Sequence, residues 1–421
     1  MQGNGKRGTV LVVGGGISGI STAVELAEVG CEVILVEKTP YLGGRVTQFH
    51  QYFPKLCPPA CGLEINIRRI KTSPHIRCLT LAEVTQVSGE PGDYRATIRR
   101  QPRRVNGKCT ACGACVNACP VERPNAFDFG MSTTKAIYLP HETAYPLQFA
   151  IDGDVCLGEE CARCVPACPY DAIELGMPPE TEDVSVQAVV WATGWQPFDA
   201  TRLEPLGFGR HPNVITNVMM ERLAAGGGPT GGRIQRPSDG KGVEAVAFVQ
   251  CAGSRDENYL KHCSGVCCLA SLKQVRYVRE QYPDAKIYVF YIDIRAPGRL
   301  EDFFVTAKQD ERLTLIKGKV AKITEAPVSR DLVVEAENAL TGERVRQQVS
   351  LVVLATGLVP VGGGGVQVEA GLRTDEDGFL LDEQAQGALL AAGCAKRPAE
   401  VGACVRDATG VAARALHYCT G

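Results

Sequence analysis

The sequence shows no excess of charge of either sign and no long apolar run. Lys and Arg together number 45, and Asp and Glu number 47, a balance that indicates no polyanionic partner such as nucleic acid. No stretch approaches the length of a membrane span. Residues 1–8 are polar and lack the apolar region of a signal peptide. We therefore expect a soluble, cytoplasmic protein without a membrane span of its own.

Two common catalytic arrangements are also missing. The sequence has no His-Glu-x-x-His motif and no Ser-His-Asp set, and its six histidines are scattered. Cysteine, by contrast, is abundant: the 421 residues include nineteen. In a reducing compartment, this number indicates metal or redox chemistry. The length suits two or three domains with a sizeable apolar core.

Eight of the cysteines form two regular runs in the first half of the chain. The first run has the spacing C-x2-C-x2-C-x3-C-P, and the second has C-x4-C-x2-C-x3-C-P. This spacing wraps three thiolates around one [4Fe–4S] cluster and sends the fourth cysteine to a second cluster. Crossed ligation then assigns one cluster to Cys109, Cys112, Cys115 and Cys168, and the other to Cys119, Cys156, Cys161 and Cys164.

A disulfide framework and structural zinc are the alternatives for these runs. A framework is typical of short secreted chains, and zinc does not need two four-cysteine runs that each end in proline. The runs therefore resemble a bacterial two-cluster ferredoxin module. We place it at about residues 105–177, as an insertion, because the surrounding pattern resumes after it.

Residues 9–37 follow the order strand, glycine-rich turn, helix, strand. In G-x-G-x-x-G, the first glycine makes the turn, the second admits a pyrophosphate to the backbone and the third allows close helix–strand packing. The helix N-terminus then faces the phosphates. An acid at the end of the second strand can accept hydrogen bonds from ribose hydroxyls. The pattern predicts a dinucleotide site that includes Gly14, Gly16, Ile17, Ser18, Gly19, Glu37 and Lys38.

Three further segments resemble those of two-dinucleotide-domain flavoproteins and favour FAD over NAD. A Gly-Gly-Arg segment lies along the FAD in that class, although paired glycines also make ordinary turns. An apolar strand that ends in Ala-Thr-Gly closes the first FAD-domain stretch, and a tail helix returns to the cofactor. Here these segments supply Gly43, Gly44 and Arg45, then Ala192, Thr193 and Gly194, and finally Gly393, Cys394 and Ala403.

A second glycine fingerprint is missing after the apolar strand at 243–250. Four cysteines stand there instead, so we expect no NAD(P) at this place. Four thiolates at one strand–helix junction suit a third [4Fe–4S] cluster at the positive end of a helix over about 266–281. Buried core cysteines are the alternative. The four are Cys251, Cys263, Cys267 and Cys268.

Lys273 lies five residues after Cys268 on that expected helix. With a cluster at the start of the helix, the helix would bring Lys273 to the flavin, where its charge stabilises the reduced anionic form. A solvated helix lysine is the alternative.

Cys57 and Cys61 lie in a proline-rich loop and suit a metal, a flavin contact or no function, so we assign them no role.

Over nearly its whole length the chain resembles the flavin-bearing A subunit of heterodisulfide reductase. Matching strings include Gly-Gly-Arg-Val-Thr-Gln at 43–48, Pro-Asn-Ala-Phe-Asp at 124–128 and Phe-Val-Gln-Cys-Ala-Gly-Ser-Arg-Asp at 248–256. The resemblance implies FAD, three [4Fe–4S] clusters and electron transfer between subunits. It also implies that electron pairs are split or merged at the flavin, which is electron bifurcation or confurcation.

Within this family, the length favours one subtype. We expect no cysteine-bearing domain before Gly8 and no second ferredoxin domain after Gly421. That layout resembles the A subunit of the quinone-interacting membrane-bound oxidoreductase complex (QmoA), which links menaquinone with adenylylsulfate reductase in dissimilatory sulfate reduction. The implied partners are a second flavin/iron–sulfur subunit, a membrane quinone-reactive subunit and adenylylsulfate reductase, at a cytoplasmic site peripheral to the inner membrane.

Besides a non-enzymatic scaffold whose FAD only fixes the fold, two other functions remain open at this point. One is a heterodisulfide-reductase-type A subunit that works with a hydrogenase or a formate dehydrogenase. The other is a stand-alone NAD(P)H-dependent flavin oxidoreductase, against which the missing second glycine fingerprint argues.

The expected fold is α/β: a two-dinucleotide-binding-domain flavoprotein, thioredoxin-reductase-like, with an inserted two-cluster ferredoxin domain. Residues 65–104 read as short strands and the Gly- and Pro-rich segment 225–242 as a linker or exposed loop. The predicted segments are the first portion of the FAD-binding domain at 1–104, the ferredoxin domain at 105–177, a continuation and linker at 178–225, a second nucleotide-binding-like domain with the third cluster at 226–357, and the last portion of the FAD-binding domain at 358–421.

Overall fold

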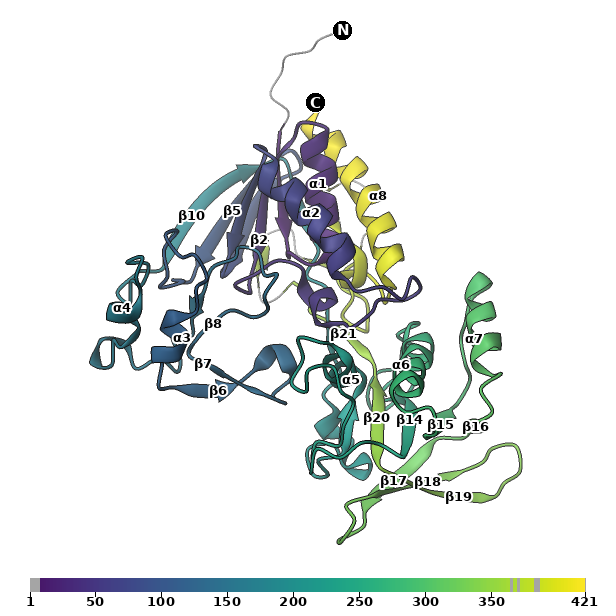
Figure 1. Ribbon diagram of the computed structural model, residues 1–421. Coiled ribbons are helices and arrows are strands. Elements are labelled where there is room, and N and C mark those ends of the chain that lie inside the picture. Colours follow the sequence, from purple (N-terminus) through teal and green to yellow (C-terminus); the bar gives the residue numbers. More distant parts are fainter. Residues whose placement is uncertain (1–7, 364–365, 369–371, 382–386, 421) are drawn as a thin grey trace.

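The computed structural model describes residues 8–363, 366–368, 372–381 and 387–420. Residues 1–7 of the first predicted segment, and residues 364–365, 369–371, 382–386 and 421 of the last, lie outside the described residues. Two parallel sheets form two halves of the molecule, and the cysteine-rich insert stands to one side of them (Figure 1).

The first half is built on a five-stranded parallel sheet. Apolar residues fill its strands, because helices cover one face and a second sheet packs on the other. Helices α1 (Ile17–Glu28) and α8 (Val401–Cys419) lie side by side on it, so the end of the chain returns to its beginning (Figure 1). The strands, in spatial order, are β23 (Leu389–Ala391), β11 (Ala188–Trp191), β1 (Thr9–Val13), β2 (Glu32–Glu37) and β3 (Ile76–Thr80).

The second sheet of this half has four strands and shares the same apolar core. Val84 and Ile98 project from it into the cluster that also holds Leu11 and Leu35. In spatial order its strands are β10 (Glu180–Val186), β5 (Asp93–Arg100), β4 (Ala82–Glu90) and β22 (Gln367–Val368).

The prediction of short strands from residue 65 is wrong for residues 65–72. They belong to helix α2 (Ala60–Thr72), which packs against the first half. Leu63 and Ile70 are buried, and Ile67 between them packs against the same core. This spacing puts the three side chains on one face of a helix, whereas the β-branched residues alone read as strand.

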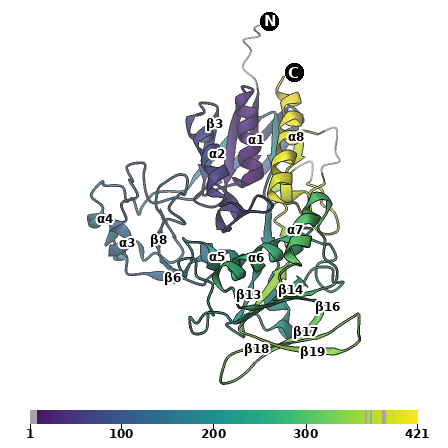
Figure 2. The ribbon, with the colours of Figure 1, turned by 45° about the vertical axis from the view of Figure 1, so that its right-hand side comes forward.

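The second half repeats the parallel layout with a different set of strands. Helices α5 (Asn217–Ala224), α6 (Cys267–Gln281) and α7 (Glu301–Ala307) belong to it, and a three-stranded antiparallel sheet closes its lower end (Figure 2). The parallel strands, in spatial order, are β13 (Val214–Thr216), β20 (Leu351–Thr356), β14 (Ala245–Ala252), β15 (Lys286–Tyr291) and β16 (Leu313–Lys317), and the antiparallel ones are β17 (Val320–Glu325), β18 (Leu332–Glu337) and β19 (Arg344–Val349).

The predicted start of the second half at residue 226 needs correction. Strand β13 pairs with β20, with Val214 opposite Val352 and Ile215 opposite Val353. The second sheet therefore already includes residues 214–216, and α5 follows directly. Three residues are too few to show a strand period in the sequence, so only the pairing reveals them.

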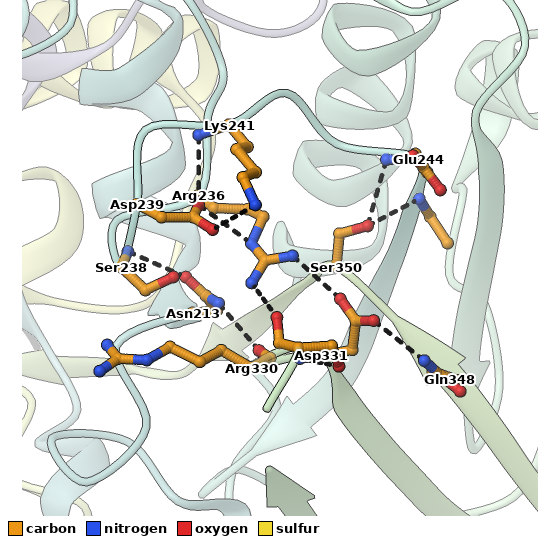
Figure 3. A network of polar contacts seen from close by, with 12 residues as sticks. Asn213, Arg236, Ser238, Asp239, Lys241, Glu244, Arg330, Asp331, Gln348 and Ser350 are labelled. Carbon is orange, nitrogen blue, oxygen red and sulfur yellow. Dashed lines mark hydrogen bonds and ion pairs between the residues drawn. The ribbon is translucent and has the colours of Figure 1, made fainter. Parts of the chain in front are cut away.

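The segment 225–242 has no regular secondary structure but is not simply an exposed loop. Arg236 is buried and forms ion pairs with Asp331, at 3.0 Å, and with Asp239, at 3.3 Å (Figure 3). The side chain of Asn213 accepts from the Ser238 N–H at 3.1 Å and donates to the Arg330 carbonyl at 3.0 Å. These contacts hold the segment against the β17–β18 connection.

The insert has a small core of its own and a fixed contact with the second half. Val105 and Ile173 form a bridge where the chain enters and leaves it. A buried ion pair of 2.8 Å between Asp128 and Arg222 of α5 ties it to the second half. Its elements are α3 (Ala114–Ala118), β6 (Glu122–Pro124), β7 (Thr133–Lys135), β8 (Ile137–Tyr138), β9 (Ala150–Ile151) and α4 (Cys164–Ala167).

Two short antiparallel strands connect the halves, β12 (Trp195–Pro197) and β21 (Leu358–Pro360). No helix in the described part of the chain is long and apolar enough to cross a membrane.

Candidate flavin and iron–sulfur site

A cavity of about 1000 Å³ lies where the two halves and the insert meet. The glycine turn after β1 forms one wall, and residues 265–273 at the start of α6 form another. Residues 123–127 of the insert close a third side. A space of this size is at the upper end of the range for small-molecule and cofactor sites.

Most of the residues predicted to contact a dinucleotide line this cavity. Gly19, Gly43, Gly393 and Ala403 do not line it, although each is a near neighbour in sequence of a residue that does. The lining residues among the predicted set are Gly14, Gly16, Ile17, Ser18, Glu37, Lys38, Gly44, Arg45, Ala192, Thr193, Gly194 and Cys394, together with Lys273.

The three glycines of the turn have different steric surroundings. At Gly14, with φ +109°, a Cβ would lie 2.3 Å from the Ala192 carbonyl oxygen, and at Gly19 one would lie 1.8 Å from the Gly14 carbonyl oxygen. A Cβ on Gly16 would meet nothing within 4 Å. Two glycines thus permit close packing within the protein, while Gly16 leaves open space in front of the α1 N-terminus. That space fits an approaching pyrophosphate.

Glu37 sits at the end of β2, as predicted, and its carboxylate is buried. Its two oxygens accept from the backbone N–H groups of Gly15, at 2.6 Å, and Thr39, at 2.7 Å. Burial raises the pKa of Glu37, and these hydrogen bonds oppose the rise. The carboxylate is therefore held in one position by the turn, and it lines the cavity where a ribose hydroxyl would be expected.

Arg45 projects into the cavity from the segment after Gly44. Its Nε donates to the Trp195 carbonyl at 3.3 Å and its Nη1 to Gln48 at 3.1 Å. Burial lowers the pKa of Arg45. The guanidinium thus bridges the Gly-Gly-Arg segment to the end of the Ala-Thr-Gly strand, two segments that the sequence places 150 residues apart.

The insert brings the predicted crossed set of cysteines together. Cys119 of the first run joins three cysteines of the second run around a small hollow of about 20 Å³. In the other set, the pKa of Cys115 is raised to about 11 by burial and by the neighbouring thiols of Cys109 and Cys112. The hollow is lined by Cys119, Cys156, Cys161 and Cys164.

The third set of cysteines also gathers at one place. Burial and the thiols of Cys268, Cys251 and Cys263 raise the pKa of Cys267 to about 12. Cys251 sits at φ +57°, where the pairing register of β14 shifts, and this turns it out of the strand. Cys267 and Cys268 open α6. The neighbouring residues Gly265 and Val266 line the large cavity, so this set borders the predicted flavin site.

The cysteines are not paired in disulfide bonds in the described part of the chain. All nineteen cysteines lie in the described part of the chain and all are free thiols. Among the described residues, no group of three or more His, Cys, Asp or Glu side chains converges as ligands of a single metal ion do.

Lys273 is not the solvated helix lysine of the alternative interpretation. It is 4% exposed, lines the cavity and forms an ion pair of 2.9 Å with Glu221 of α5. Its Nζ also donates to the Gln51 carbonyl at 2.5 Å. The ammonium group is therefore fixed at the cavity wall, with its charge partly balanced by a buried carboxylate.

Sequence reasoning missed several cavity residues. Glu221, Phe127 and Tyr138 come from segments read as linker or as ferredoxin module, and no local pattern marks them. Cys404 could have been predicted as a cavity residue, because it lies only ten residues after Cys394, which was predicted as one. Cys57 and Cys61 do not line the cavity; Cys57 accepts a backbone hydrogen bond from Tyr52.

Comparisons with known proteins agree with this architecture. The family model for an NAD(P)-binding Rossmann-like domain matches residues 12–77. The model for a 4Fe-4S dicluster domain matches residues 108–172. Together with the cavity and the cysteine sets, these matches support FAD in the first half and [4Fe–4S] clusters in the insert.

Solved structures show the same fold at low sequence identity. Thioredoxin reductase of T. acidophilum gives a TM-score of 0.53 at 13% identity, covering 98% of this chain and 99% of that one. Bacillithiol disulfide reductase of Bacillus cereus gives 0.50 at 13% identity, covering 97% of this chain and 98% of that one. The predicted thioredoxin-reductase-like fold with a dicluster ferredoxin domain is thereby confirmed.

The sequence relatives are closer. The A subunit of the H(2):CoB-CoM heterodisulfide,ferredoxin reductase of Methanothermobacter thermautotrophicus is 38% identical over 418 residues, which are 96% of this chain and 63% of that protein. The iron-sulfur A subunit of the CoB–CoM heterodisulfide reductase of Methanocaldococcus jannaschii is 38% identical over 417 residues, with the same coverage. The chain thus spans a little under two thirds of the length of these relatives, and over that length it is similar to the A subunits of heterodisulfide reductases.

Proposed function

We propose that this chain is an oxidoreductase subunit that passes electrons between FAD and [4Fe–4S] clusters within a multi-subunit complex. One observation carries the proposal: the cavity wall includes residues of both cysteine-bearing regions. Phe127 comes from the insert, and Val266 directly precedes Cys267 of the third set. A flavin in this cavity would border the residues next to the third set of cysteines and the insert that carries the other two sets, an arrangement that favours electron transfer among them.

The residues divide the task of holding the flavin. Gly16 leaves room for the pyrophosphate, Glu37 is placed to accept from the ribose, and Arg45 and Lys273 bring positive charge to the cavity. Bound there, FAD would supply a centre that takes or gives electrons singly or in pairs.

We also propose a third cluster on Cys251, Cys263, Cys267 and Cys268, which brings the total to three. Twelve assigned cysteines then correspond to twelve irons per chain. Iron analysis of anaerobically purified protein with FAD present tests this count. A value near eight would remove the third cluster from the proposal.

A stand-alone NAD(P)H oxidoreductase is the competing function. The junction after β14 carries thiols where a nicotinamide dinucleotide would need a glycine turn. We expect that NADH or NADPH leaves the flavin absorbance of the anaerobic protein unchanged, while a one-electron donor of low potential bleaches it. Rapid bleaching by NADH would favour the competing function instead.

For the complex, two arrangements are proposed. The first is the quinone-linked type, with a second flavin/iron–sulfur subunit, a membrane quinone-reactive subunit and adenylylsulfate reductase, at a site peripheral to the inner membrane. The second is an arrangement with a hydrogenase or formate dehydrogenase, which is favoured because the relatives are named as subunits of heterodisulfide reductases. Purification of the native complex and identification of its subunits distinguishes them, and electron bifurcation can then be tested with the whole assembly.

A further inference from the structure

Two thiols outside the predicted cluster ligands lie side by side in the wall of the flavin cavity. The Sγ atoms of Cys394 and Cys404 are 3.7 Å apart. The two residues are 6% and 4% exposed, and both line the cavity. Cys394 lies in the turn Gly393–Ala395, and Cys404 lies near the start of α8.

The surrounding contacts hold this pair in place. Gly393, at φ +63°, packs so closely on α1 that a Cβ there would lie 2.0 Å from Ser18 Oγ. The Gly393 N–H donates to Asp407 at 2.8 Å, and Lys396 forms an ion pair with Asp407 at 2.7 Å. The turn is thereby fastened to α8 on both sides of Cys394. A disulfide would shorten the distance between the two sulfurs from 3.7 Å to about 2.05 Å.

The two thiols differ in acidity. The hydrogen bond from the Cys404 thiol lowers the pKa of Cys394, and the same bond with burial raises the pKa of Cys404. The thiolate is the reactive form of cysteine, so the pair has one member suited to start a reaction and one suited to complete it.

We propose that Cys394 and Cys404 form a redox-active dithiol that exchanges an electron pair with the flavin in this cavity. The inference rests on the proposed FAD. In oxidation, two S–H bonds break and one S–S bond forms. Two electrons and one proton pass to the oxidised flavin, and the second proton is released to solvent. Reduced flavin reverses the step, so the pair stores two electrons beside a centre that feeds one-electron clusters.

The alternative role for two such residues is apolar filling, because free cysteine is among the most buried residue types. The chain offers a matched pair of that kind. Cys31 and Cys419 contact each other far from the cavity lining, and burial and Cys31 raise the pKa of Cys419 to about 12. This pair serves as the internal control.

Peptide mapping of the anaerobically purified holoprotein tests the proposal. The protein is poised with its flavin oxidised or reduced, as read from flavin absorbance, then acid-quenched, alkylated in denaturant and digested without reductant. Trypsin places Cys394 on peptide 374–396 and Cys404 on peptide 397–406, because Pro398 protects Arg397. The control cysteines fall on peptides 8–38 and 415–421.

We expect the disulfide-linked pair of peptides in most molecules with oxidised flavin, and two separately alkylated peptides in most molecules with reduced flavin. The control peptides stay unlinked in both states. If the flavin is oxidised and the disulfide-linked pair of peptides is absent, the proposal of a redox-active dithiol is wrong. Protein that binds no flavin would overturn the proposed function first, and the dithiol with it.

A variant gives a second readout. Cys404→Ser should take up two fewer electrons per chain than the wild type in a reductive titration, with Cys394 then fully alkylated in every state. An unchanged electron count would overturn the proposal. If Cys404→Ser does not fold, Cys394→Ser or the wild-type peptide map decides the question.

Discussion

The junction after β1 and the junction after β14 occupy equivalent places, each between a buried parallel strand and a helix of its half. The first is a tight glycine turn that leads directly into α1 at Ile17. At the second junction the chain leaves the direction of β14 at Cys251, and a longer loop follows before α6 begins at Cys267. Both helices present an N-terminus to the cavity, which favours negative charge.

With the proposed third cluster, the difference would let the same strand–helix junction serve two different cofactors. At the first junction, absent side chains make room for a phosphate to approach the backbone. At the second, a longer loop supplies the four thiols of the proposed third cluster, in front of the helix. The topology sets where a ligand lies, and the residues at the strand end decide which ligand it is.

Removing a ligand at the second junction should have the largest effect. In Cys267→Ser, we expect iron to fall from about twelve to about eight per chain, with FAD retained, because the first junction is untouched. Flavin reduction by a one-electron donor should slow at least tenfold. Cys78→Ser, at a partly buried thiol outside the proposed clusters, is the control. If the iron content of Cys267→Ser is unchanged, the four cysteines at this junction are buried core residues and not cluster ligands.

A side chain at Gly16, in the first junction, should strongly weaken FAD binding without unfolding the protein. A Cβ at Gly16 meets nothing within 4 Å and its φ of −77° suits alanine, so Gly16→Ala should fold. Its methyl group would occupy the place of the pyrophosphate. We expect FAD affinity to fall by about 100-fold or more, which is about 2.7 kcal/mol, as measured by FAD release on dilution.

Gly19→Ala is the contrasting variant for that test. Its Cβ would lie 1.8 Å from the Gly14 carbonyl oxygen, so it should lower the free energy of unfolding of the apoprotein as well. Equal thermal stability of the two alanine variants would contradict the assignment of packing to Gly19 and of ligand space to Gly16.

A substitution of Glu37 tests the expected ribose contact at the end of β2, beside the first junction. Glu37→Ala removes the acceptor expected for the ribose and should weaken FAD binding by roughly 1.5–3 kcal/mol, about 10- to 150-fold. Since Glu37 also accepts from Gly15 and Thr39, some stability is lost too. Glu37→Gln keeps the shape and should lose less of both. FAD retention equal to the wild type would argue against a ribose contact.

Lys273 gives the smallest expected effect, at the second junction. Lys273→Met keeps the stem and removes the charge, so reduced anionic flavin is less stabilised and the flavin potentials should fall. With Glu221 balancing part of the charge, a Coulomb energy of about 1–2 kcal/mol corresponds to roughly 20–40 mV for a two-electron couple. Iron and FAD content should stay the same.

The ion pair itself supplies the control for Lys273. Glu221→Gln removes the opposing charge and should raise the potentials, because Lys273 then acts on the flavin unopposed. Spectroelectrochemical titration measures both variants. Potentials equal to wild type in both would leave the pair a purely structural contact between α5 and α6.

The sequence by itself determined the features that depend on local spacing. The ferredoxin cysteines and the glycine turn could be read directly, because each cluster or phosphate is held mainly by residues within one short segment. The apolar strand β1 and the helix α6 were also predicted closely, since a buried apolar run and a helix after a cysteine pair leave strong local patterns.

Only the tertiary structure decided what depends on residues far apart in the chain. It pairs β13 with β20, buries Lys273 against Glu221 and brings Cys394 to Cys404 at the cavity wall. It also makes one cavity border both cysteine-bearing regions. None of these contacts has a spacing that sequence periodicity records, because they arise where separate helices and strand ends pack together, and that packing exists only in the folded chain.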